Sequence, residues 1–186
     1  MAVTPAGTPY VESSDLVASY PGTSLALANH IDGLDGGKVL QVVSVTKVDA
    51  FTTTSTSYVD VTGLTASITP SAVSSTILVL VKVAMNPRSN SVSWAQLLRG
   101  ATVIGGGTAS GGRPSAMSTF SPLGTGGTGD IMGNFRDSPA SASSQTYKIQ
   151  VAVNTGTLGV NTSFDDADVG YAPRTSSTIT LMEISA

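Results

Sequence analysis

The pattern of hydrophobic and polar residues along the chain changes near residue 37. Beyond that point, apolar and polar residues alternate in short runs separated by glycine, proline, asparagine and serine. Period-two alternation sends successive side chains to opposite faces of a strand, so it predicts half-buried β-strands. Turn signals recur about every eight to twelve residues, a spacing typical of antiparallel sandwiches and jelly rolls. We therefore predict an all-β domain over residues 38–186, an antiparallel β-sandwich or jelly roll of about ten strands.

Three runs give the clearest strand predictions. Thr76–Met85 is almost continuously apolar, which predicts a central strand buried on both faces. Thr146–Asn154 alternates, and Ser176–Ser185 places Ile179, Leu181 and Glu183 on one face. Further strands are predicted at Val39–Thr46, Ser57–Val61, Thr65–Thr69, in a hairpin that turns at Arg99 and Gly100, and at Met117–Phe120.

Residues 1–37 follow a different pattern and are predicted to form a separate unit. The first eleven residues carry two prolines and no periodicity, which predicts an extended arm. Further on, Leu27, Ile31 and Leu34 recur at i, i+4 and i+7, one face of a short helix that ends near Gly33 or Gly36. A helix of about twelve residues is marginal alone. We therefore expect the stripe to be buried against the β domain or against copies of itself.

Composition removes several classes of function. Charged residues make up only 11% of the chain, and the net charge is −3, which argues against a nucleic-acid partner. The absence of cysteine excludes disulfides, zinc–thiolate sites and cysteine nucleophiles. No apolar run is long enough for membrane insertion, and the N-terminus lacks the pattern of a secretory signal. Stabilisation by oligomerisation is the expected substitute for disulfides.

The candidate metal ligands are the three carboxylates of one loop. Asp165, Asp166 and Asp168 could together bind calcium, but the spacing of an EF-hand is absent, and a solvated turn is the favoured interpretation. His30, the only histidine, is interpreted as a helix-surface or subunit-contact residue and not as a general base. No metal and no other cofactor are predicted.

No catalytic constellation is found. Glu183 and Asp130 could act as an acid pair for glycan cleavage, but nothing in the sequence brings them together, and aromatic residues are only 5% of the chain. We therefore predict that the protein is not an enzyme. Asn161 begins a formal N-glycosylation motif. The glycine-rich segments Gly105–Gly112 and Gly124–Gly129 are candidate glycan contacts, although plain loops or subunit contacts are favoured.

Two regions together resemble virion proteins of tailed bacteriophages, chiefly tail-fibre and minor tail proteins. The first is "TPYVESSDLVASYPGTSLALANHIDGL", residues 8–34, which is similar to the N-terminal attachment segment of such fibres. The second is the β domain, from "GKVLQVVSVTK" through "TSYVDVTGLTASITPSAVSSTILVLVKV", "LLRGATVIGGG" and "FRDSPASASSQTYKIQV" to "STITLMEI". It resembles the distal globular domain of many phage fibres and of some capsid-surface proteins.

The resemblance implies a short homotrimeric tail fibre or knob, made in the host cytoplasm and located in the virion. It would dock on other virion proteins by its N-terminus and present the sandwich for host attachment, with a surface glycan as a candidate partner. The alternative is a capsid decoration or cement protein on the phage head. Oligomerisation is assigned to Leu27, Ile31 and Leu34. The attachment residues that the resemblance implies are Pro9, Tyr10, Val11, Leu16, Val17, Tyr20 and Pro21.

Overall fold

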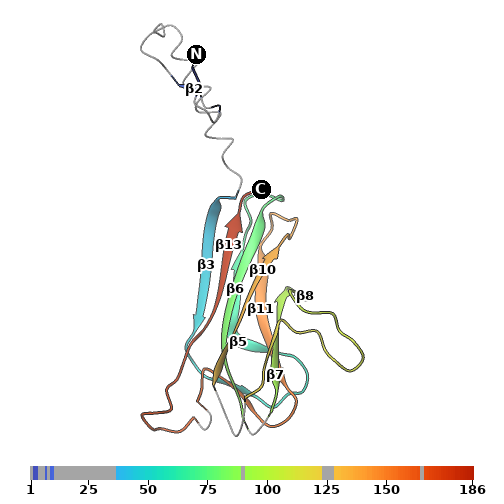
Figure 1. The fold of residues 1–186 in the computed structure, drawn as a ribbon, viewed down its shortest axis with the longest axis vertical. Coiled ribbons are helices and arrows are strands. Elements are labelled where there is room, and N and C mark those ends of the chain that lie inside the picture. Colours follow the sequence, from blue (N-terminus) through green and yellow to red (C-terminus); the bar gives the residue numbers. More distant parts are fainter. Residues whose placement is uncertain are drawn as a thin grey trace.

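The computed structural model describes residues 2–3, 7, 9–10, 37–88, 91–122, 128–163 and 166–186. From residue 37 onward these residues form two antiparallel sheets packed face to face, which confirms the predicted all-β sandwich (Figure 1). The predicted total of about ten strands and the jelly-roll connectivity are not confirmed. The predicted helix with its stripe lies outside the described residues, and none of the described residues is in a helix.

The first sheet is built around β6 (Thr76–Pro87). One edge of β6 pairs with β10 (Gly129–Asp137) along most of its length. The other edge pairs first with β13 (Ser177–Ile184) and then with β12 (Leu158–Val160). The sheet is completed by β3 (Val39–Lys47), which pairs with β13, and by β4 (Phe51–Thr53), which pairs with β12.

The second sheet is built around β11 (Gln145–Val153). It lies between β5 (Val59–Ile68) and β7 (Ser93–Arg99). The far edge of β7 pairs with β8 (Thr102–Ile104) and, further along, with β9 (Ser118–Phe120). Burial alternates along much of β5 and β11, because one face of the sheet packs on the other sheet.

The core lies between the two sheets and consists of their inward side chains. Burying this apolar surface is the main favourable term for a chain that has no disulfide. The aromatic member Tyr147 is fully buried, and its hydroxyl donates to Asp137 Oδ2 at 2.7 Å. Arg99 bonds to the same oxygen at 2.6 Å, so the buried carboxylate is paired. The fully buried aliphatic residues include Leu64, Ile77, Val79, Val83, Ile149, Val151, Leu158, Ile179 and Leu181.

The strand directions give the sandwich two different ends. At the end that we call proximal, the chain enters at residue 37, and the loops after β5, β7 and β10 and the C-terminus lie together. At the opposite, distal end lie the loops after β3, β4, β6, β9, β11 and β12 (Figure 1). Figure 1 shows the C-terminus beside the start of β3.

Strand β5 corrects one prediction. Ser57–Val61 and Thr65–Thr69 were expected as two strands, but the structure has a single strand, because Gly63 does not interrupt it. Gly63 adopts a φ of 84°, and the register against β11 shifts at this point. The irregularity is therefore a bulge within one strand, a position where glycine avoids the strain of a left-handed backbone.

Two strands of the sandwich, β4 and β10, were not predicted. The burial predicted for β6 is confirmed only in part. β4 is three residues long, and β10 carries Gly133 where its inward alternation would need an apolar side chain. Met117 occupies that place, with its sulfur 2.5 Å from where a Cβ of residue 133 would lie. β6 is central, as predicted, but its outward residues Leu78 and Leu80 are only half-buried.

Asn161 ties together four segments at the distal end. Its Nδ2 donates to the carbonyls of Lys47 at 2.9 Å and Asp49 at 3.1 Å, and its Oδ1 accepts from the Ser177 hydroxyl at 2.6 Å. Its backbone N–H donates to the Ala84 carbonyl at 3.0 Å. The residue is fully buried with a φ of 61°. Its amide nitrogen is thus committed to the fold and is not accessible as a glycan acceptor.

Replacement of Asn161 by glycine is expected to cost about 2–4 kcal/mol, because the carbonyls of Lys47 and Asp49 and the Ser177 hydroxyl lose a partner. Asn161→Ala should cost about 1 kcal/mol more, since alanine also carries the strain of the left-handed backbone. Urea unfolding of both variants measures these differences. Equal stability of Asn161→Gly and the parent would show that the network contributes nothing.

Candidate functional site

The predicted attachment residues fall mainly outside the described part of the chain. Pro9 and Tyr10 form β2 (Pro9–Tyr10), which pairs antiparallel with β1 (Ala2–Val3). This is an extended backbone, as predicted for the arm. The remaining members lie outside the described residues and stay predictions: Val11, Leu16, Val17, Tyr20 and Pro21 for attachment, and Leu27, Ile31 and Leu34 for oligomerisation.

The point at which the N-terminal segment joins the sandwich is fastened to the C-terminus. Gly37 donates its backbone N–H to the Ser185 carbonyl at 3.2 Å, and Ser185 returns a bond to the Lys38 carbonyl at 2.9 Å. Lys38 also donates its N–H to the Ser185 hydroxyl at 3.1 Å. A pull on the N-terminal segment is therefore transmitted to β13 as well as to β3, and from β13 to the central strand β6.

Glu183 is a buried carboxylate at the proximal end that binds the loop between β5 and β6. Its side chain is fully buried, and its two oxygens accept hydrogen bonds from the N–H and hydroxyl of Ser71 and from the amide of Gln41, at 2.6–2.7 Å. Burial opposes ionisation, but these bonds and one from Ser75 lower the pKa of Glu183 to about 2. The carboxylate thereby holds the loop between β5 and β6 against β3 and β13.

The structure does not bring the candidate acid pair, Glu183 and Asp130, together. Asp130 lies at the distal end of β10, opposite Ala84, whereas Glu183 lies at the proximal end of β13, opposite Ile77. The two carboxylates are therefore separated along most of β6. Asp130 instead faces Lys82, with 3.3 Å between the carboxylate and the ammonium.

The acidic loop at the distal end is organised by an ion pair. Both oxygens of Asp166 bond to the guanidinium of Arg174, at 3.1 and 2.8 Å. Asp168 lines the same small depression on the loop, and Asp165 lies outside the described residues. The described residues hold no group of three potential metal ligands. Asp166 is thus engaged by a cation of the chain itself, and the calcium site stays a prediction because Asp165 lies outside the described residues.

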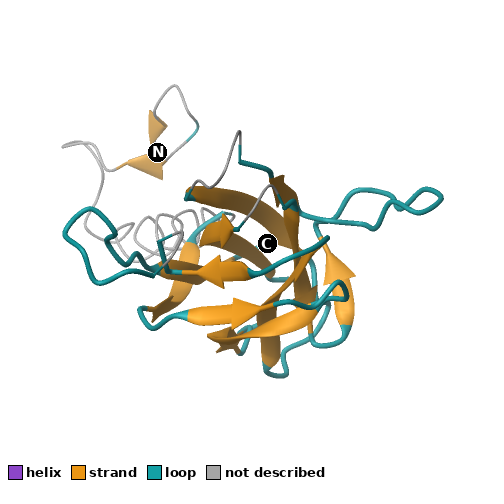
Figure 2. Cartoon of the chain, turned by 90° about the horizontal axis from the view of Figure 1, so that it is seen from below, coloured by secondary structure: helices purple, strands orange, loops and turns teal. Residues whose placement is uncertain are grey.

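The glycine-rich segment that begins at Gly105 forms a lateral hairpin, residues 105–116, which projects from the side of the sandwich between β8 and β9 (Figure 2). Gly107 donates to the Ala116 carbonyl at 3.1 Å, and Ser110 and Arg113 exchange backbone bonds near the tip. The Tyr58 hydroxyl donates to the Ser115 carbonyl and fixes the base. The exposed residues of the hairpin are glycines, Thr108, Ala109, Ser110 and Pro114, with Arg113 as the one charged member. Of the second segment, residues 124–127 lie outside the described part.

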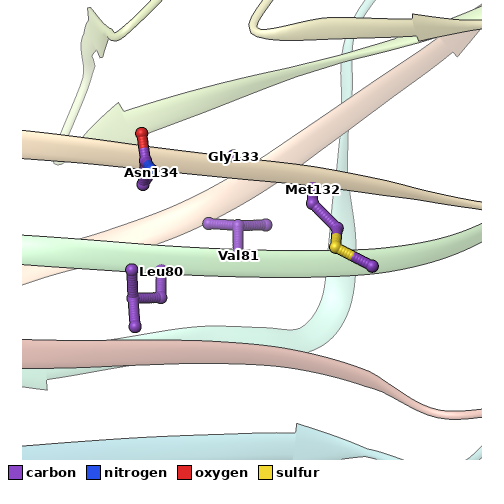
Figure 3. A pocket seen from close by; sticks show the side chains of 5 residues that line it. All are labelled: Leu80, Val81, Met132, Gly133 and Asn134. Atoms are coloured by element: carbon purple, nitrogen blue, oxygen red, sulfur yellow. The ribbon is translucent and has the colours of Figure 1, made fainter.

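The outer face of the first sheet is more apolar than the sequence analysis anticipated. An open depression of about 370 Å³ lies over β6 and β10 and is lined by Leu80, Val81, Met132, Gly133 and Asn134 (Figure 3). Met132 is 68% exposed. On β3, at the other side of the same face, Leu40 and Val42 are also exposed. This outer face was missed because its residues are single apolar positions within alternating runs.

No helix in the described segments is long and apolar enough to cross a membrane.

Comparison with known proteins gives weak structural matches. No protein-family model matches the chain, and no curated protein does. Among solved structures, the VP2 subviral particle of infectious bursal disease virus matches with 12% identity and a TM-score of 0.37, over 77% of this chain and 39% of the viral chain. The Gx strain of that virus gives 15% identity, a TM-score of 0.37 and coverages of 78% and 37%.

The T13 viral particle of the same virus gives 16% identity, a TM-score of 0.38 and coverages of 81% and 36%. The matched structures are thus viral particle proteins, and this chain spans well under half of their length. Neither a family nor a function follows from matches at this level.

The buried carboxylate makes stability depend on pH. The pKa of Glu183 lies near 2 in the folded protein, against a usual value of 4.5. Its contribution of about 3 kcal/mol is therefore present above pH 4.5 and is lost as pH falls towards 2. Glu183→Gln should be less stable than the parent by this amount at pH 7, with a difference that shrinks below pH 4.

Denaturant unfolding between pH 2 and 7 measures this effect. Asp168→Asn, which removes an exposed carboxylate on the acidic loop, is the matched control and should leave the profile unchanged. A constant difference between Glu183→Gln and the parent across this range would contradict the proposed role of ionised Glu183.

Proposed function

We propose that the chain is a structural protein of a tailed-bacteriophage virion, without enzymatic activity. It attaches to the particle through its N-terminal segment and presents the distal end of the sandwich to the host surface. The proposal rests first on the resemblance of residues 8–34 and of the β domain to phage fibre proteins. Its finer form is a short tail fibre or knob.

The polarity of the sandwich is the observation that carries this proposal. The N-terminal segment enters at one end, where Gly37 and Ser185 are bonded to each other. Six loops lie at the other end, the longest of which, between β12 and β13, contains the acidic loop. A protein held by its N-terminus would thus direct those loops away from its anchor. This is the arrangement that an attachment protein needs.

The loops suit contact with a hydroxylated or glycan surface more than contact with a highly charged one. Hydroxyl and small residues dominate them, and the acidic loop neutralises Asp166 internally with Arg174. Low charge limits long-range steering, so recognition would depend on short hydrogen bonds and on many weak contacts. Repetition of the domain in a homotrimer would raise the avidity of such contacts.

A decoration protein on the phage head is the second candidate. The observation that favours it is the short connection between the attachment segment and the sandwich, because β3 begins only two residues after Gly37. With no shaft between them, the sandwich would sit close to the surface to which the N-terminus binds.

Removal of residues 1–36 tests the attachment part. The truncated chain is expected to fold, because the core that the described residues form is built from residue 43 onward, but to be absent from purified particles. The matched control replaces residues 108–114 of the lateral hairpin by two glycines, which retains the Gly107–Ala116 bond and should leave incorporation unchanged. Quantitative blotting of purified particles gives both results. Normal incorporation of the truncated chain would refute N-terminal attachment.

The trimer is tested separately at the predicted helix. Leu27→Asp combined with Ile31→Asp removes two apolar residues worth about 1.5–3 kcal/mol each when buried. If the stripe joins three copies, this variant should have one third of the parent mass in analytical ultracentrifugation. Asn29→Asp, a change at a polar position between them, is the control. A mass that the double variant leaves unchanged would exclude association through this stripe.

A further inference from the structure

Strand β10 has a free edge along its whole length. It pairs with β6 on one side only, from Gly129 opposite Met85 to Asp137 opposite Ile77. No backbone hydrogen bond reaches its other side from any described residue. In an antiparallel ladder alternate residues direct their N–H and C=O groups to opposite edges, so every second residue of β10 leaves both groups unpaired on this side. Such an edge is a template for another strand, and proteins usually blunt it unless it is used.

The side chains of β10 are complementary to those of a second, antiparallel copy of the same strand. When two copies pair about Gly133, Asp130 of each lies opposite Arg136 of the other. This register therefore creates two opposite-charge pairs related by a two-fold axis. Cross-strand pairs of opposite charge stabilise a sheet, and like charges directly opposite destabilise it.

The neighbouring registers lack this match. A shift by one residue in each strand about Met132 places Asp130 opposite Asn134. A shift the other way, about Asn134, places Arg136 opposite Met132. In both registers neither charge meets an opposite charge across the new interface, and Asp130 keeps only Lys82 of its own copy. Registers that pair an inward-pointing residue of one copy with an outward-pointing residue of the other are also disfavoured. They would place the buried face of one copy on the solvent side of the joined sheet.

Exposed apolar surface borders this edge on the outer face of the sheet. Met132 points outward beside the two-fold position and borders the depression formed with Leu80 and Asn134 (Figure 3). In the paired register, Met132 lies opposite Asn134 of the second copy and diagonal to its Met132. Diagonal neighbours are within reach of long side chains. The two methionines would therefore be diagonal neighbours on the outer face of the joined sheet.

The opposite edge of the sheet does not offer such a match. On β3 the only charged residue is Lys47, whose side chain is buried and whose ammonium bonds to Asp49 at 2.6 Å. Two copies of β3 would therefore bring no opposite charges together.

We propose that two copies of this chain associate through their β10 strands, antiparallel about Gly133, so that the first sheets of both copies become one continuous sheet. The interface is isologous, with the same patch on both copies. It does not depend on the proposed function. The helix stripe alone would give a trimer, and the β10 edge alone would give a dimer. Both contacts together would give a complex of six copies.

The mass of the full chain in solution tests the proposal. Met132→Lys places two ammonium groups beside the two-fold axis and should halve the mass, whether the parent is a dimer or a complex of six. Val42→Lys makes the same kind of change on β3, where the side chain is 54% exposed on the same outer face, and should leave the mass unchanged. Circular dichroism should show both variants folded, because neither side chain belongs to the core. If the Met132→Lys variant is folded and keeps the mass of the parent, the proposal is overturned.

A charge exchange tests the register. Arg136→Asp places Asp opposite Asp130 twice in the pair and should halve the mass at low salt, where charges are least screened. Adding Asp130→Arg to that variant restores opposite charges with the signs exchanged, and the parent mass should return. Failure of the double variant to recover, in a folded chain, overturns this register.

Spin labels give a measurement that is independent of charge. The chain has no cysteine, so Met132→Cys and Val42→Cys each provide a single labelling site. In the proposed pair, labels at 132 should lie within about 20 Å of each other, and labels at 42, three strands away in each copy, about 40 Å apart. Labels at 132 that are separated as widely as those at 42 would overturn the proposal.

Discussion

The pairing of β6 on both of its edges is the constraint on which the rest of the structure depends. This strand pairs with β10 on one side and with β13 and β12 on the other. Three later segments of the chain must therefore return to β6. Its inward residues Ile77, Val79, Val81 and Val83 are at most 4% exposed. Without a cysteine in the chain, this central burial has to hold the first sheet together.

Networks of buried polar groups close the two ends of the sandwich. Glu183 binds the loop between β5 and β6 at the proximal end, and Asn161 binds the turn after β3 at the distal end. Each is satisfied by several partners, as a buried polar group must be. They act in different ways, because the first depends on a charge and the second on an amide in a left-handed backbone. The proximal network lies beside the hydrogen bond between Gly37 and Ser185, so the junction between the N-terminal segment and the sandwich is reinforced.

Sequence patterns predicted the strands whose faces differ most. Ile179, Leu181 and Glu183 share the inward face of β13, as their alternation indicated, and β6 is central as its apolar run indicated. β10 was missed because Gly133 takes an inward position that Met117 fills from another segment, which no local pattern reveals. The division at Gly63 was wrong because a glycine that normally ends a strand is here accommodated in a bulge.

The candidate sites were less predictable than the fold. The spacing of the acidic residues could not show that Arg174 occupies Asp166, because that contact depends on the path of the loop. The free edge of β10 could not be seen before the strand order was known. The predicted stripe of Leu27, Ile31 and Leu34 and most attachment residues lie outside the described residues, so their roles remain predictions.

The central claim is that the sandwich is anchored at its proximal end and presents its distal loops. Cryo-electron microscopy of the intact particle tests it most directly. We expect density for the sandwich with residue 37 and the C-terminus towards the particle and the loop between β12 and β13 pointing outward. The position of that density on tail or head would also separate fibre from decoration protein. A sandwich with its distal loops against the particle, or particles without the chain, would contradict the account.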